Sequence, residues 1–167
     1  MKTLIAIDPG KKGAIAVWSA MNRDDNVTPM PATLRDIIDY LKIFDDPIVY
    51  LEDVGVRPNQ GSVSNKTFMK HQGNLEAVIM TLDYKLVYVK PQVWQRHLGL
   101  LSKKTASGVK ETPGQHKMRI VAFSQQRYPH VEWNNEHGRS TKEYQLCIAD
   151  ALAILEYAKE KEKGESK

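Results

Sequence analysis

The feature that most limits how this chain can fold is a pair of short apolar runs, each of which ends at a carboxylate. Residues 3–7 (Thr-Leu-Ile-Ala-Ile) lead into Asp8, and residues 48–51 (Ile-Val-Tyr-Leu) lead into Glu52. Runs of this kind indicate strands that are buried on both faces of a sheet. Such strands need helices on both sides of the sheet, so the pattern favours an α/β domain.

The segments around these runs predict a mixed sheet of five strands flanked by helices. Residues 13–18 follow closely enough on residues 3–7 to form a hairpin, and a third strand is expected near Val27. Thr33 and Asp36 resemble a capping box, which predicts a helix that stops before residue 47. The later elements are expected as a loop over 57–65, helices over 64–82, 91–98, 115–127 and 141–159, a strand over 85–89 and a mobile segment over 99–114. The first three strands would form an antiparallel meander, and the others would add in parallel through helical crossovers.

Length and composition bound the class of protein. A chain of 167 residues is expected to form one domain, here residues 1–160, followed by a charged flexible tail at 161–167. No apolar run approaches the ~18 residues that a membrane-spanning helix needs. Cys147 is the single cysteine, which excludes an intramolecular disulfide. The N-terminal segment lacks the pattern of a secretory signal, so we expect a cytoplasmic protein.

Positive charge is concentrated in the middle of the chain. Residues 57–119 carry 11 Lys and Arg against 3 Asp and Glu, whereas residues 1–56 carry 6 against 9 and residues 120–167 carry 7 against 8. Segregated positive charge attracts a phosphate backbone whatever its sequence. A solvated surface that happens to be rich in lysine explains the charge alone equally well.

Three carboxylates are expected to meet at one edge of the sheet. A helical crossover makes the strands that end at Asp8 and Glu52 parallel, so both residues would lie at the edge where such sheets bind ligands. Two carboxylates there repel each other unless a cation lies between them. Asp150 stands among small and apolar residues of the last helix, where a buried carboxylate needs a partner. Singly, the three could be a turn residue, a strand-end surface residue and half of a buried ion pair; together they favour a site for Mg²⁺ or Mn²⁺.

Motifs along most of the chain resemble those of a known family, the RuvC Holliday junction resolvases of the ribonuclease-H-like superfamily, and especially its phage-encoded branch. The motifs are Ile7-Asp8-Pro9-Gly10 with Gly13, Leu51-Glu52 after a buried strand, Ala149-Asp150-Ala151-Leu152 in the last helix, and segments 89–100 and 117–129. The resemblance extends from residue 4 to about residue 158. Asp-Pro-Gly alone is shared with ATPases of the actin-like superfamily, and the Ala-Asp-Ala-Leu helix adds the specificity.

The resemblance implies a ribonuclease-H-like fold and a homodimer that resolves four-way DNA junctions, during recombination and repair, in the cytoplasm of a bacterial or phage-infected cell. Symmetric hydrolysis of two strands would leave 5′-phosphate and 3′-hydroxyl nicks. Two Mg²⁺ or Mn²⁺ ions per active site would be bridged by Asp8, with Glu52 and Asp150 each completing one coordination sphere. The helix after Glu52 would form much of the dimer interface through Leu75, Val78, Ile79 and Leu82, although packing within one subunit explains these side chains equally well.

One position departs from the family pattern. The family usually has Asp or His one turn before the final Asp, where this chain has Cys147. A thiol is a poor ligand for a hard cation. Glu143 lies two turns before Asp150 and could substitute as a metal ligand, or it could be a solvent-facing residue favoured by the helix dipole. Without a substitute, the second ion would be held weakly.

Several other residues are candidates for contact with DNA. Lys117 matches a position where the family tends to have Lys near the scissile phosphate, and is otherwise an ordinary surface or phosphate-binding Lys. Phe68 could stack on a base at the junction centre, although core packing is the commoner role for such a residue. Trp94 and Trp133 are most simply core, and the five histidines show no metal-ligand spacing. Residues expected to bind phosphate are Arg57, Lys66, Lys70, Lys103 and Lys104.

Three other functions fit parts of this pattern. A nuclease of the same fold could act on other branched or single-stranded DNA. A junction-binding protein with weakened or lost catalysis is suggested by Cys147. A small ATPase of the actin-like superfamily is disfavoured, because the chain is too short for a second lobe and lacks a second phosphate loop.

Overall fold

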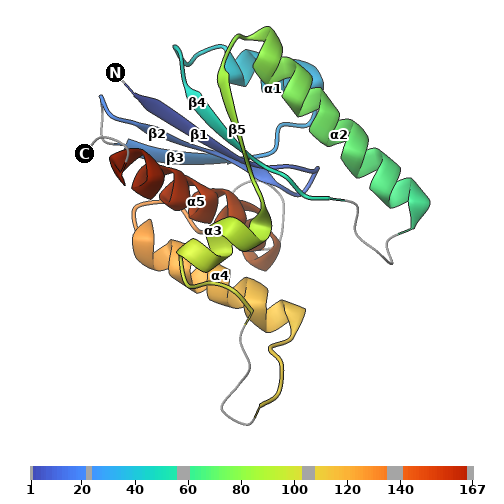
Figure 1. Ribbon diagram of the computed structural model, residues 1–167, viewed down its shortest axis with the longest axis vertical. Coiled ribbons are helices and arrows are strands. Elements are labelled where there is room, and N and C mark those ends of the chain that lie inside the picture. The colour runs from blue at the N-terminus through green and yellow to red at the C-terminus, as the bar shows by residue number, and fades with distance from the viewer. Residues whose placement is uncertain (1, 22–23, 56–60, 103–107, 135–140, 165–167) are drawn as a thin grey trace.

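The computed structural model describes residues 2–21, 24–55, 61–102, 108–134 and 141–164. They form a five-stranded sheet with helices on both faces (Figure 1). In this part of the chain, no helix combines the length and the apolar character that a membrane crossing requires.

The sheet has the mixed topology that the sequence predicts. Its strands are β1 (Thr3–Asp8), β2 (Ala14–Ser19), β3 (Asp24–Pro29), β4 (Ile48–Glu52) and β5 (Lys85–Val89). Their spatial order is β3-β2-β1-β4-β5. The first three strands pair antiparallel as a meander, while β4 pairs in parallel with β1 and β5 in parallel with β4. The predicted α/β fold is therefore confirmed.

Two separate layers of core explain why the central strands are apolar throughout. Along β1, Ile5 and Ile7 are buried against α1 (Leu34–Leu41) and α2 (Ser62–Thr81). Leu4 and Ala6 point to the opposite face and are buried beneath α5 (Thr141–Gly164). The helices α3 (Pro91–His97) and α4 (Pro113–Arg127) pack around α5 on this second face (Figure 1).

The helix starts follow local capping chemistry. Thr33 and Asp36 form the predicted capping box at α1. Thr112 and Gln115 form a second one at α4, which therefore begins at Pro113 rather than near residue 115 as expected. Both boxes satisfy backbone N–H groups that the first helical turn leaves without partners.

The apolar side chains of α2 that were considered for a dimer interface pack inside this chain. Leu75 and Ile79 are 0% exposed and Val78 is 6% exposed, all within the core shared with α1. Leu82 is partly buried against the same core. Packing within one subunit accounts for these four residues, so they give no support to a dimer.

The last helix continues beyond the expected end at Lys159 to Gly164. Glu162 is buried, accepts a 2.6 Å hydrogen bond from the Tyr50 hydroxyl and forms an ion pair with Lys2. Residues 161–164 of the expected tail are thus helical, and residues 165–167 lie outside the described residues.

Candidate functional site

Asp8 and Glu52 end two neighbouring parallel strands, β1 and β4, and lie side by side at the carboxyl edge of the sheet. In the parallel pairing of β1 with β4, Ile7 is opposite Leu51, and each carboxylate residue follows directly. Asp8 is half-buried, whereas Glu52 is 6% exposed. The parallel arrangement inferred from the apolar runs is correct.

A cavity of about 330 Å³ opens beside these two carboxylates. Asp150 reaches it from α5, which crosses the sheet face, and Lys117 reaches it from the first turns of α4. The complete lining is Asp8, Pro9, Gly10, Lys11, Lys12, Gly13, Glu52, Gly55, Ser64, Asn65, Phe68, Lys117 and Asp150. The structure therefore brings the three expected carboxylates to one hollow, together with three lysines.

The carboxylates line the cavity without forming a closed cage. Among the described residues, no three His, Cys, Asp or Glu side chains are grouped closely enough to hold one ion as they stand. The donor set itself fits Mg²⁺ or Mn²⁺, because it consists of hard carboxylate oxygens at the edge of an open hollow.

Glu52 is fixed in place by a buried hydrogen bond. The indole Nε1 of Trp94, in α3, donates to Oε1 of Glu52 across 2.8 Å. Trp94 is fully enclosed in the core, as predicted, and it also orients a cavity carboxylate. A buried carboxylate needs such a donor, since burial without hydrogen bonds is costly.

The turn between β1 and β2 forms one wall of the cavity. Gly10 has a φ of +111°, and its carbonyl accepts a 3.0 Å hydrogen bond from the Gly13 N–H. A Cβ at Gly13 would clash with the carbonyl oxygen of Asp8. Only glycine fits both positions, so the turn holds the backbone of Asp8 closely.

Cys147 supports this same turn and does not line the cavity. Its buried Sγ donates to the carbonyl oxygen of Gly13 at 3.0 Å. Glu143, the possible substitute ligand, forms a 3.1 Å ion pair with Lys12. Its partner Lys12 lines the cavity, whereas Glu143 itself does not. Its role as a metal ligand stays a prediction.

His71 touches the turn from the other side. The Gly10 N–H donates to Nδ1 of His71 at 3.2 Å. Burial, and to a smaller degree the charge of Lys11, lower the pKa of His71. Phe68, one turn earlier in α2, is partly buried with its ring against Gly10. Phe68 lines the cavity and belongs to neither core cluster, contrary to the core packing that the sequence favoured, and its stacking on a base stays a prediction.

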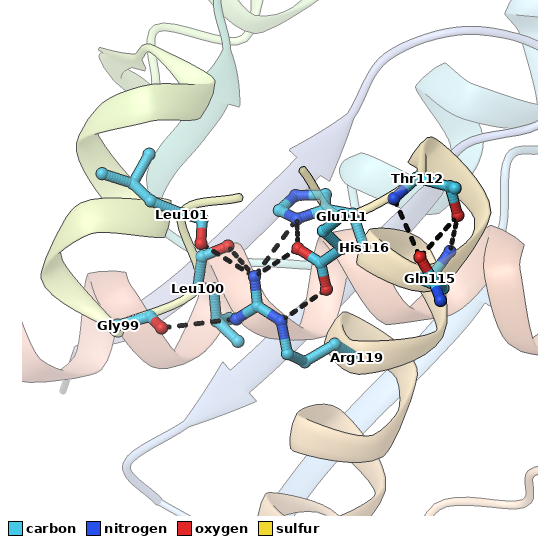
Figure 2. A network of polar contacts seen from close by, with 8 residues as sticks. All are labelled: Gly99, Leu100, Leu101, Glu111, Thr112, Gln115, His116 and Arg119. Atoms are coloured by element: carbon cyan, nitrogen blue, oxygen red, sulfur yellow. Dashed lines mark hydrogen bonds and ion pairs between the residues drawn. The ribbon is translucent and has the colours of Figure 1, made fainter. Parts of the chain in front are cut away.

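Lys117 stands on a helix whose start is tied down by a polar network. Arg119 donates to the carboxylate of Glu111 and to carbonyl oxygens of Gly99, Leu100 and Leu101 (Figure 2). His116 is also in contact with Glu111, at 3.3 Å. The network joins the segment after α3 to the first turns of α4, which carry Lys117.

Of the other basic residues expected to bind phosphate, two are exposed and three lie outside the described residues. Lys66 and Lys70 are exposed on α2, outside the cavity lining. Arg57, Lys103 and Lys104 lie outside the described residues. Their contact with DNA stays a prediction.

Sequence reasoning missed several residues of this site, among them two lysines, a histidine and a tryptophan. Lys11 and Lys12 directly follow the Asp-Pro-Gly motif, and that adjacency was the available signal. His71 and Trp94 gave no signal, because their partners Gly10 and Glu52 lie 61 and 42 positions away.

Comparisons with known proteins show the fold. No protein-family model matches the chain, and no curated protein matches it. Among solved structures, RuvC of T. thermophilus in complex with a Holliday junction substrate is similar, with 13% identity, coverage of 91% of this chain and 89% of that chain, and a TM-score of 0.51. A further Thermus thermophilus RuvC structure has 10% identity, coverage of 94% and 95%, and a TM-score of 0.44. The first match, with the sheet order, shows that the chain has the ribonuclease-H-like fold.

Proposed function

We propose that this protein is a metal-dependent, structure-selective endonuclease that resolves four-way DNA junctions. The observation that carries the proposal is the meeting of Asp8, Glu52, Asp150 and Lys117 around one cavity at the carboxyl edge of a ribonuclease-H-like sheet. Hydrolysis of paired phosphodiesters would give 5′-phosphate and 3′-hydroxyl ends. The closing experiment below tests both the chemistry and the choice of DNA.

The cavity carboxylates Asp8, Glu52 and Asp150 would hold two Mg²⁺ or Mn²⁺ ions. When bound, such ions supply Lewis acidity and a stronger water nucleophile at the scissile phosphate. Trp94 keeps one oxygen of Glu52 at the cavity wall. The turn at Gly10 and Gly13 holds the backbone of the neighbouring Asp8.

The lysines of the cavity would handle the phosphate charge. Lys117 is exposed on α4 and lines the cavity, so its ammonium can neutralise charge that develops on the phosphate in the transition state. Lys11 and Lys12 are exposed at the mouth and can attract the DNA backbone before chemistry begins. Phe68 offers a ring at the same mouth on which an unstacked base can lie.

Four-way DNA is the proposed substrate for two reasons. The similar T. thermophilus protein is seen in complex with a Holliday junction substrate, and the middle of this chain carries excess positive charge. Paired nicking requires two active sites, so we propose that the working form is a homodimer. The described part of one chain gives no interface for it.

A second candidate is a junction-binding protein with weak catalysis. Two observations favour it: Cys147 is engaged with the Gly13 carbonyl, and Glu143 is engaged with Lys12. Neither side chain lines the cavity, so its carboxylates are those of Asp8, Glu52 and Asp150. This candidate predicts junction binding with no product in either Mg²⁺ or Mn²⁺.

Labelled four-way, three-way and flap DNA, each incubated with Mg²⁺, Mn²⁺ or EDTA, separate these possibilities. Paired nicks in the four-way DNA only, dependent on the cation, support the proposal. Equal cutting of all three substrates would mean a general branched-DNA nuclease. Binding without product would support the second candidate, and the absence of both binding and cutting would defeat the two together.

A further inference from the structure

His71 occupies an unusual place, because it faces the turn that carries a proposed metal ligand without facing the cavity itself. Its Nδ1 accepts the Gly10 N–H at 3.2 Å, and its side chain is half-buried between α2 and the turn. A hollow on its outer side is shared with Gly10, Lys11 and Phe68. The cavity of the three carboxylates does not include His71.

The hydrogen bond fixes the chemical form of the imidazole. A ring nitrogen can accept an N–H only when it carries no proton, so His71 must be neutral and must carry its proton on Nε2. Burial first, and the neighbouring Lys11 second, lower the pKa of His71 and favour this neutral form. The hydrogen bond from Gly10 and the lowered pKa therefore both indicate a neutral His71.

The turn transmits this contact to Asp8. The carbonyl of Gly10 accepts the N–H of Gly13, and the Cα of Gly13 lies against the carbonyl oxygen of Asp8. From α5, Cys147 donates to the carbonyl of Gly13. A shift at Gly10 would thus be passed through Gly13 to the backbone of Asp8.

We propose that His71 is a positioning residue for Asp8, which clamps the Asp8–Gly13 turn from α2 while Cys147 clamps it from α5. The inference rests on the proposed function in one respect, namely that Asp8 is a metal ligand. His71 itself would touch neither the cation nor the DNA. Groups that orient metal ligands from behind commonly change metal affinity by about 10- to 100-fold when they are removed.

Two substitutions separate the hydrogen bond from the bulk of the side chain. His71→Leu keeps much of the volume and removes the acceptor. His71→Asn places an amide oxygen near the position of Nδ1 and keeps an acceptor. His97→Asn is the matched control, because His97 pairs with Glu160 at the α3–α5 contact, away from the turn.

The first readout is Mn²⁺ affinity of the full chain without DNA, measured by electron paramagnetic resonance. His71→Leu should bind Mn²⁺ about 10- to 100-fold more weakly, whereas His71→Asn and His97→Asn should stay close to the parent protein. In junction cleavage, His71→Leu should lower kcat with little change in KM, and His71→Asn should restore kcat.

The second readout is hydrogen exchange of the Gly10 amide, which needs neither metal nor cleavage. The amide should be protected in the parent protein and in His71→Asn, and should exchange faster in His71→Leu. Should His71→Leu fail to fold, His71→Ala is the second variant without an acceptor. The proposal would be overturned if the acceptor-free variant kept the parental Mn²⁺ affinity and the parental protection of the Gly10 amide. It would also be overturned if His71→Asn lost Mn²⁺ affinity and Gly10 protection as much as His71→Leu does. A parent protein that neither binds Mn²⁺ nor cuts DNA refutes the proposed function, while Gly10 exchange still decides whether His71 clamps the turn.

Discussion

The indole Nε1 of Trp94 lies 2.8 Å from Oε1 of Glu52, and this hydrogen bond joins the core to the cavity. Trp94 is 1% exposed and Glu52 is 6% exposed. A hydrogen bond between two side chains so deeply buried resists competition from water. One oxygen of a proposed metal ligand is therefore held by the packing of α3 against α5.

Replacing Trp94 with Phe should weaken both the fold and the metal site. The ring still fills much of the space, but the buried carboxylate loses the Trp94 hydrogen bond, which costs about 1–3 kcal/mol of unfolding free energy. Metal affinity should fall by about tenfold or more, because Glu52 loses its orientation. Urea unfolding and a Mn²⁺ titration measure the two effects. Trp133→Phe is the control, since its Nε1 donates to the Tyr128 carbonyl at 3.0 Å, away from the cavity, and it should change stability only.

Asp8→Asn tests whether the cavity carboxylates hold cations. The amide keeps the size of the side chain but removes its charge, so cleavage of a four-way junction should fall by at least about 100-fold. Junction affinity in EDTA should stay nearly the same, because the proposed phosphate contacts come from lysines and not from Asp8. Gel-shift and cleavage assays on one preparation compare the two. A fully active Asp8→Asn protein would refute the metal assignment.

Much of the fold could be predicted because its signals are local. Apolar runs locate β1 and β4, the Thr33–Asp36 box locates α1, and a turn motif follows Asp8. The convergence of Asp8 and Glu52 followed from strand direction alone, because parallel strands end at the same edge. Asp150 was recognised from its apolar neighbours and from the family motif.

The contacts that organise the site could not be predicted in this way. Cys147 and Gly13 are 134 positions apart, and nothing in either local sequence indicates the partner. The end of α5 was missed for a related reason. Its Lys and Glu residues are typical of a solvated tail, whereas Glu162 is buried with partners from distant parts of the chain, namely Lys2 just before β1 and Tyr50 in β4.

Cys147→Ser should leave the stability of the fold nearly unchanged, whereas Cys147→Asp should lower it. Serine keeps a neutral donor toward the Gly13 carbonyl, so stability should change by about 1 kcal/mol or less and cleavage should persist. Aspartate places a charge in a buried position against a carbonyl oxygen, and should cost about 3 kcal/mol or more in EDTA. If its carboxylate reaches a cation, Mn²⁺ will restore stability, which thermal unfolding with and without Mn²⁺ will show. Equal stability of both variants in EDTA would contradict the contact with Gly13.

Glu162 should make stability depend on pH in the acid range. Burial raises the pKa of this carboxyl, but hydrogen bonds from Lys2 and Tyr50 outweigh it and leave the pKa below the ordinary value. A carboxyl with a lowered folded pKa stabilises the protein above its unfolded pKa of about 4.3, and that contribution is lost as pH falls through the folded value. Glu162→Gln should thus be less stable than the parent at pH 7, with the difference shrinking below about pH 4. Thermal unfolding across this range measures it, and a difference that does not change with pH would contradict the assignment.

Arg119→Lys should separate cleavage from DNA binding through the network that precedes Lys117. The guanidinium of Arg119 contacts both oxygens of Glu111, at 3.0 Å each, and the Leu101 carbonyl at 2.8 Å (Figure 2). Lysine has one ammonium and cannot make these forked contacts together, so about 1–2 kcal/mol of stability should be lost. Because the network ties the start of α4 to the segment after α3, its loss should let Lys117 drift from the cavity and lower kcat by about tenfold, at nearly unchanged junction affinity.

The control for this prediction is Arg127→Lys, which alters an ion pair between the exposed Arg127 and the partly buried Glu156 at the far end of the same helix. That variant should cleave as the parent does, because lysine keeps the positive charge and the pair lies away from Lys117. A single-turnover assay on a four-way junction, with affinity measured separately in Ca²⁺, distinguishes slower chemistry from weaker binding. Equal loss of affinity and rate in Arg119→Lys would place the network in DNA binding instead of in the positioning of Lys117.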